Sequence, residues 1–120
     1  MRFEDTIEEL FASFPALRSK YEDEGDYING LSHLCYEIVF VPFIRQAVFD
    51  GNENLIASIC DYFERMAGSD NEDERVSELL AVSVLEPILS ERELVRILKE
   101  HMGNLTLNLF TYMEKETGWG

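Results

Sequence analysis

The sequence predicts an all-α fold: an irregular bundle of six to seven antiparallel helices, with HEAT-like curvature as a variant of that shape. Three observations predict it. Apolar residues recur at spacings of three and four along nearly the whole chain. Capping and helix-ending residues separate these stretches by short loops, and almost no segment alternates with the period of a strand. The 120 residues are 46% hydrophobic, enough for one core, so we expect a single helical domain over residues 1–120.

The N-terminal stretch is predicted to form one helix that ends at Pro15 and a short second helix after it. Proline restricts the preceding residue to extended conformations, which ends the first helix. Because proline is also tolerated in a first helical turn, we expect the second helix from Ala16 to about Asp23 and its end at Gly25. The apolar stripe of the first helix is Phe3, Ile7, Leu10, Phe11 and Phe14.

A densely apolar segment from Tyr27 to Phe49 predicts a central, buried helix that is kinked or broken before Pro42. A proline inside a helix removes one hydrogen bond, and its ring crowds the carbonyl of the preceding turn. The run from Ile38 to Val41 would by itself also fit a strand, but its flanks favour a helix.

The next helix is predicted to begin at an N-cap, Asn52, and to end at Gly68. Its apolar face repeats at helical spacing from Leu55 to Met66. A polar, acidic connector from Ser69 to Glu74 follows, and a further apolar stripe then continues until Pro87.

Two more helices are predicted at the C-terminal end of the sequence. Ser90 and Glu93 match a capping box, in which each residue bonds the backbone of the other. Gly103 ends that helix, Asn104 opens the last one, and Gly118 ends it. The apolar face expected for the last helix is Leu105, Leu109, Tyr112 and Met113.

The charge of the chain limits the partners that it can bind. There are 24 acidic and 10 basic residues, a net charge of −14, and residues 1–74 alone hold 17 of the acids against 5 bases. A nucleic-acid binder needs a basic surface to displace counterions, and anionic membranes repel an acidic protein. The sequence therefore predicts a cationic protein as partner, with no direct nucleic-acid or membrane binding.

Two acidic clusters are the predicted contact surfaces. The first is flanked by tyrosines, and aromatic rings among charges are typical of protein-binding hot spots. Like charges at such density repel one another, which favours a basic partner, although a solvated surface that promotes solubility is the alternative explanation. The candidate partner-binding residues are Tyr21, Glu22, Asp23, Glu24, Asp26, Tyr27, Asp70, Glu72, Asp73 and Glu74.

No motif for catalysis, cofactors or metals is found in the sequence. There is no glycine-rich phosphate loop, two EF-hand-like counts in the acidic loops lack the required glycine, and His33 does not share a helix face with Cys35. We therefore expect neither an enzyme nor a bound cofactor or metal. Cys35 and Cys60 are expected to be reduced core residues, and the acidic start does not match an export signal, so a cytoplasmic location is expected.

Three short motifs carry a resemblance to known proteins: Gly-Asn-Glu-Asn-Leu at residues 51–55, Tyr-Phe-Glu at 62–64 and Ala-Val-Ser-Val-Leu-Glu at 81–86. The region from Phe40 to Glu86 resembles a segment of a family of small, uncharacterised bacterial helical proteins. In its small size, acidity and lack of catalytic groups, the chain also resembles bacterial immunity proteins, which neutralise toxins such as those of contact-dependent growth inhibition.

That resemblance implies an inhibitor that binds a basic toxin domain, often a nuclease, by steric and electrostatic occlusion. The alternative is a helical adaptor or scaffold that binds a peptide or helix of a partner in an apolar groove. A small regulatory enzyme without a recognisable motif is a third possibility. One feature of the sequence does not fit an inhibitor of a basic toxin. Five basic residues could form a patch that repels such a toxin: Arg45, Arg65, Arg92, Arg96 and Lys99.

Overall fold

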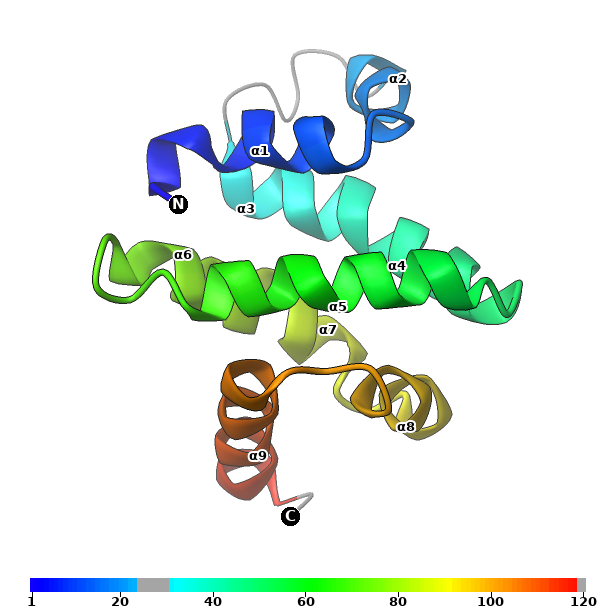
Figure 1. Ribbon diagram of the computed structural model, residues 1–120, viewed down its shortest axis with the longest axis vertical. Helices are drawn as coiled ribbons and strands as arrows, with labels where there is room; N and C mark the ends of the chain where they lie inside the picture. Colours follow the sequence, from blue (N-terminus) through cyan, green and yellow to red (C-terminus); the bar gives the residue numbers. More distant parts are fainter. Residues whose placement is uncertain (24–30, 119–120) are drawn as a thin grey trace.

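The computed structural model describes residues 1–23 and 31–118 and confirms the all-α fold (Figure 1). These residues contain no strand and form seven continuous helices, two of which include a π-helical segment, η3 or η4. The elements are η1 Phe3–Asp5, α1 Thr6–Ser13, α2 Leu17–Asp23, α3 Ser32–Cys35, η3 Tyr36–Phe40, α4 Val41–Phe49, α5 Glu53–Ala67, α6 Glu74–Leu79, η4 Leu80–Leu85, α7 Glu86–Ile88, α8 Arg92–Lys99 and α9 Asn104–Thr117.

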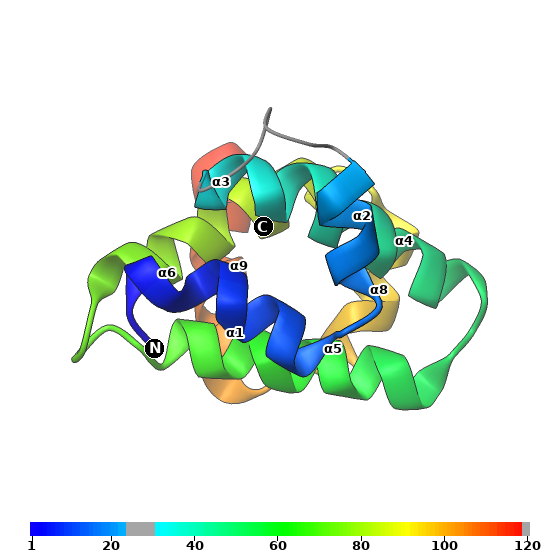
Figure 2. The ribbon, with the colours of Figure 1, turned by 90° about the horizontal axis from the view of Figure 1, so that it is seen from above.

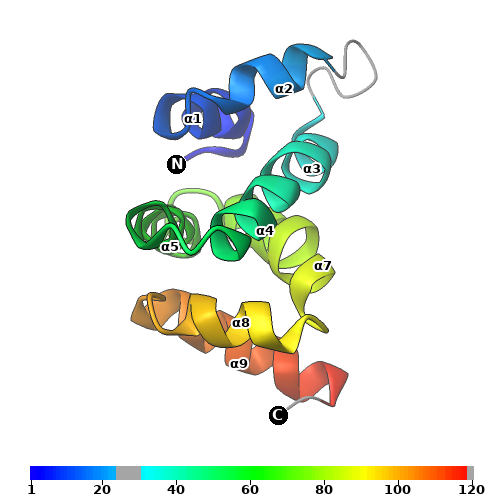
Figure 3. The ribbon, with the colours of Figure 1, turned by 90° about the vertical axis from the view of Figure 1, so that its right-hand side faces the viewer.

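The helices stack in three layers that follow the order of the chain. Helices α1 and α2 form one outer layer, α8 and α9 form the other, and α3 to α7 lie between them (Figures 1 and 3). The molecule measures 38 × 34 × 23 Å along its principal axes. Stacking in chain order is a feature that helical repeats share. No helix in the described part of the chain has the length and apolar character needed to span a membrane.

Two prolines are accommodated within continuous helices, because a π-helical segment precedes each one. In η3 the N–H of Val41 donates to the carbonyl of Tyr36, five residues earlier, just before Pro42. In η4 the N–H of Glu86 likewise donates to Ala81, just before Pro87. The wider turn makes room for the proline ring, so neither helix is broken. The two π-helical segments also pack against each other.

Local chemistry fixes several helix ends as predicted. The Asn52 side chain accepts a hydrogen bond from the N–H of Leu55 at 3.2 Å and caps α5, which ends before Gly68. Helix α9 ends at Gly118, which has a positive φ of 84° that glycine adopts without strain.

The predicted capping box before α8 is wrong. The helix begins at Arg92, and its N-cap is Glu91 rather than Ser90. The carboxylate of Glu91 binds Arg45, and Glu93 pairs with Arg96 at 2.6 Å instead of reaching back to the backbone. At this helix end the acidic side chains therefore form ion pairs instead of capping the backbone N–H groups.

A hydrogen-bonded tyrosine pair joins three helices at the centre of the core. The Tyr36 hydroxyl donates to the carbonyl of Thr6 at 2.7 Å and lies 2.6 Å from the Tyr62 hydroxyl. Burial raises the pKa of Tyr62 to about 12. Phe40 is fully buried and meets both tyrosine rings edge-on at 5.7 and 5.8 Å between centroids. This cluster ties α1, η3 and α5 together.

Both cysteines are buried and unbonded to each other, as the sequence predicted. Burial raises the pKa of Cys35 to about 11 and that of Cys60 to about 12, so both are thiols at neutral pH. We expect Ellman's reagent to label neither residue in native buffer and both in guanidinium chloride, measured by thiolate absorbance. Rapid labelling of the native protein would contradict this burial.

Candidate protein-binding surfaces

The first predicted acidic cluster lies at the end of α2. Tyr21 is half-buried, and its ring lies 5.1 Å from that of Phe11 between centroids, so it contributes to the core of the N-terminal layer. Glu22 is exposed, and Asp23 is the last residue of α2. Glu24, Asp26 and Tyr27 lie outside the described residues.

Two carboxylates of the second cluster serve the fold. Asp73 caps α6 through the N–H of Arg75, and it also accepts the N–H of Phe3 at 2.9 Å. Hydrogen bonds from the Arg75 side chain, together with the one from the backbone N–H of Phe3, hold the pKa of Asp73 far below its usual range. Glu72 pairs with the ammonium of Met1 at 3.0 Å. Both residues therefore fasten the connector to the N-terminal segment.

The other two carboxylates of this cluster face a hollow between α6 and α9. Asp70 accepts a hydrogen bond from Ser77, and Glu74 lies one helical turn before Glu78. These three carboxylates line a hollow of about 490 Å³ together with Leu109. None of the three forms an ion pair with a described residue.

Exposed apolar side chains of α9 form the other wall. Leu105 is 49% exposed and Tyr112 is 63% exposed, and their spacing places them with Leu109 on one face of the helix. A second hollow continues the first one along α9 and shares Asp70 and Leu109 with it. We define the α6–α9 groove by Asp70, Glu74, Glu78, Leu105 and Leu109, which line the two hollows. Tyr112 continues the same face of α9 one turn beyond Leu109.

This wall corrects part of the apolar face predicted for α9, of which Leu109 and Met113 do pack against the core. Leu105 and Tyr112 point to solvent, while Phe110, which was not predicted to be in that face, is completely buried. The buried stripe runs instead through Thr106, Phe110 and Glu114, at spacings of four. Apolar residues on more than one side of α9 allowed either assignment, and packing against α5 decided between them.

The described part of the first cluster, on α2, does not share a surface with the second cluster. Figures 1 and 2 both place α2 and the connector between α5 and α6 toward opposite sides of the molecule. Of the two predicted clusters, it is the second whose carboxylates lie beside exposed apolar side chains among the described residues.

The basic residues that could have opposed a cationic partner are all compensated within the protein. Each one binds at least one of the chain's own carboxylates, so they do not present an uncompensated patch. The pairs are Arg45 with Glu91, Arg65 with Glu9, Arg96 with Glu93 and Glu100, and both Arg92 and Lys99 with Glu114.

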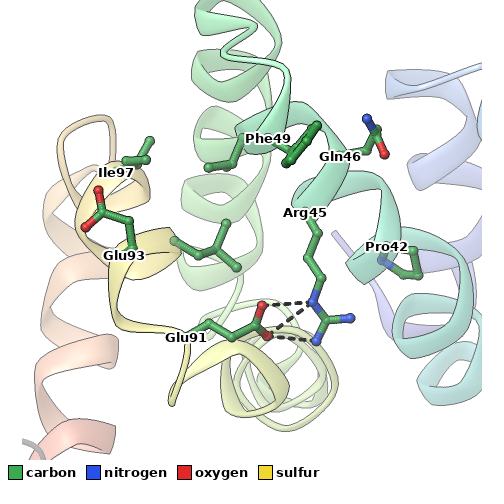
Figure 4. Close-up of a pocket in the computed structure, with 9 residues that line it drawn as sticks. Pro42, Arg45, Gln46, Phe49, Glu91, Glu93 and Ile97 are labelled. Atoms are coloured by element: carbon green, nitrogen blue, oxygen red, sulfur yellow. Dashed lines mark hydrogen bonds and ion pairs between the residues drawn. The ribbon is translucent and has the colours of Figure 1, made fainter.

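A separate hollow, of about 480 Å³, lies between α4 and α8 (Figure 4). Phe49 stands at its edge with 87% of its surface exposed. The Arg45 guanidinium binds Glu91 through two nitrogens at 2.8 to 3.1 Å, and this bonding raises the pKa of Arg45. We define the α4–α8 hollow by Arg45, Phe49, Glu91, Glu93, Leu94 and Ile97, which are among the residues that line it.

The fold also brings together one serine and one histidine that lie 50 positions apart in the sequence. Nδ1 of His33 lies 2.7 Å from Oγ of Ser83. Ser83 is only 2% exposed, so its oxygen is not accessible to a substrate in this conformation. The contact links α3 to η4. No group of three or more histidine, cysteine or acidic residues in the described segments is placed to hold a metal ion.

One family model matches the chain over residues 7–120, and it is described as a domain of unknown function (DUF7674). No curated protein and no solved structure matches the chain. The match therefore covers nearly all of the helical domain and assigns no activity to it.

Proposed function

The chain belongs to the DUF7674 family, and we propose that it is an immunity protein that binds and neutralises a basic bacterial toxin domain of the nuclease type. The observation that supports this function best is the α6–α9 groove. It combines three carboxylates that have no cationic partner in the described chain with the exposed side chain of Leu105, and the exposed ring of Tyr112 follows on the same face of α9. Protein-binding hot spots have this composition: apolar and aromatic side chains supply the buried area, and nearby charged side chains guide the partner into position.

Electrostatics favours a cationic partner for this groove. A nuclease active site is basic, because it must hold phosphates. Glu74 and Glu78 lie on neighbouring turns of α6 and attract such a site. The range of this attraction is the Debye length, which becomes shorter as the salt concentration rises. Steered association reaches about 10⁸–10⁹ M⁻¹s⁻¹, against about 10⁵–10⁶ M⁻¹s⁻¹ for neutral surfaces. The proposed mechanism is fast capture followed by steric block of the cleft.

The internal ion pairs support the same function. Because the arginines and Lys99 named above bind acidic side chains of their own protein, the net charge of −14 is left on other carboxylates. A basic toxin approaching the α6–α9 groove would not meet an opposing basic patch there.

The experiment uses this protein as the bait in affinity capture from a lysate of the native host. It compares the wild type with two variants, each of which reverses the charge of two glutamates. Glu74→Lys/Glu78→Lys changes the groove. Glu37→Lys/Glu53→Lys makes the same charge change at exposed sites elsewhere, which form no ion pair with a described residue. We expect the wild type and the control to retain a basic protein that elutes as NaCl rises. The groove variant is expected to bind it at least about tenfold more weakly. Circular dichroism checks that both variants stay helical.

Neutralisation is tested with the captured protein itself. Its expression should arrest bacterial growth, and co-expression of the wild-type chain, but not of the groove variant, should restore growth. Equal loss in both variants would show that net charge alone matters. An acidic partner, or one that has no toxicity, would contradict the proposed function.

The adaptor function predicted as the alternative calls for an apolar groove and little charge. Binding by such an adaptor would change little with salt. A captured partner that stays bound across the salt gradient and is unaffected by Glu74→Lys/Glu78→Lys would favour it.

A further inference from the structure

We propose that the α4–α8 hollow is a self-association surface through which two copies of this chain form a two-fold symmetric dimer. This inference is independent of the proposed function, since it uses another face and another partner. It stands on the shape of the hollow, the exposure of Phe49 and the pairing of the charges around it.

The shape of this surface fits a second copy of itself. In a two-fold interface the same patch lies on both sides, so it must carry both a projecting group and a recess that receives one. Phe49 projects from the end of α4, and Ile97 lies across the hollow from it (Figure 4). Leu94 also lines this hollow. The ring of each copy can thus enter the hollow of the other, burying apolar surface on both sides.

The local charges also fit a second copy. Two chains of charge −14 repel each other, so they can dock only where the surface is locally compensated. Each charged side chain that lines the α4–α8 hollow is in an ion pair: Arg45 with Glu91, and Glu93 with Arg96. The carboxylates of the α6–α9 groove have no such partner in the described part of the chain. A cationic partner therefore favours the groove, and a like-charged copy favours the hollow.

This arrangement gives self-association a salt dependence opposite to that of cationic partner binding. Salt screens the repulsion between the two acidic bodies, since the Debye length falls from about 30 Å at 0.01 M to about 10 Å at 0.1 M. The dimer should therefore become stronger as NaCl rises. Capture of a basic protein by the groove should become weaker over the same range.

The experiment is sedimentation velocity of the purified full chain in about 20 mM and about 500 mM NaCl, at protein concentrations up to about 1 mM. We expect dimers in high salt and fewer in low salt. Phe49→Ala is expected to raise the dimer dissociation constant at least about tenfold, because each interface loses two rings. Tyr112→Ala, which removes an exposed ring from α9 beside the α6–α9 groove, is the matched control and should leave the dimer dissociation constant unchanged.

Phe49 is almost fully exposed in the monomer, so its substitution should leave helicity and the unfolding midpoint unchanged. A wild-type chain that stays monomeric at about 1 mM in high salt would overturn the proposal, and the hollow would then be open to a foreign apolar segment. A dimer that is insensitive to Phe49→Ala, or weakened equally by Tyr112→Ala, would overturn it as well.

Discussion

Replacing Gly103 with alanine is expected to lower the free energy of unfolding by about 2–3 kcal/mol. A Cβ at this position would lie 2.5 Å from Cδ of Glu64 and 2.7 and 2.8 Å from its carboxylate oxygens. That carboxylate caps α9, accepting the N–H groups of Leu105 and Thr106 at 3.0 and 2.9 Å and the Thr106 hydroxyl at 2.7 Å. The added methyl group would displace the carboxylate from these bonds.

A double-mutant cycle in urea separates this mechanism from other effects of alanine. Glu64→Ala should itself cost about 2–3 kcal/mol, because it leaves the α9 donors without their acceptor. In that background Gly103→Ala should cost much less, since the clashing group is gone and φ is an ordinary −76°, and only the weaker N-cap preference of alanine remains. Asp61→Ala, exposed on the same helix, is the control and should change stability little. Additive costs would contradict the mechanism.

Contacts between neighbours in the sequence were predictable. Asn52 caps α5 through its own side chain, and Gly118 ends α9 by a left-handed backbone, so both ends followed from residue type alone. The prolines indicated a disturbance of the helix, but Pro42 could not show that a π-helical turn would absorb it. The widened turn is stabilised by packing between two helices that are distant in the chain.

Only the part of the candidate site that depends on local composition, the acidic connector, was predicted from the sequence. The acidic connector was visible as a cluster, but the roles of its members depend on contacts made about 70 residues away, such as that of Asp73 with Phe3. The groove also needs α9 as its second wall, and Leu105 and Tyr112 were assigned to the core. A sequence shows how much charge is present, whereas tertiary contacts decide which carboxylates remain available.

The interface between α8 and α9 depends on one nearly buried carboxylate. The Glu114 side chain is 7% exposed and binds both Arg92 and Lys99, the latter at 2.7 Å. Burial alone would raise the pKa of Glu114, but hydrogen bonds from these two cations outweigh it and hold the pKa below its ordinary value of 4.5. Ionised Glu114 therefore stabilises the fold above that pH, and the contribution is lost as pH falls through the lowered pKa.

Glu114→Gln is expected to lower the free energy of unfolding by about 2–3 kcal/mol at neutral pH, because both cations lose their charged partner. The difference from wild type should shrink as pH falls through the lowered pKa of Glu114, because the wild-type carboxyl then also becomes neutral. Urea unfolding across this pH range measures it. Glu116→Gln, exposed on the same helix, is the control and should have little effect. A loss of equal size at every pH would show that the shape of the side chain, and not its charge, holds α9 against α8.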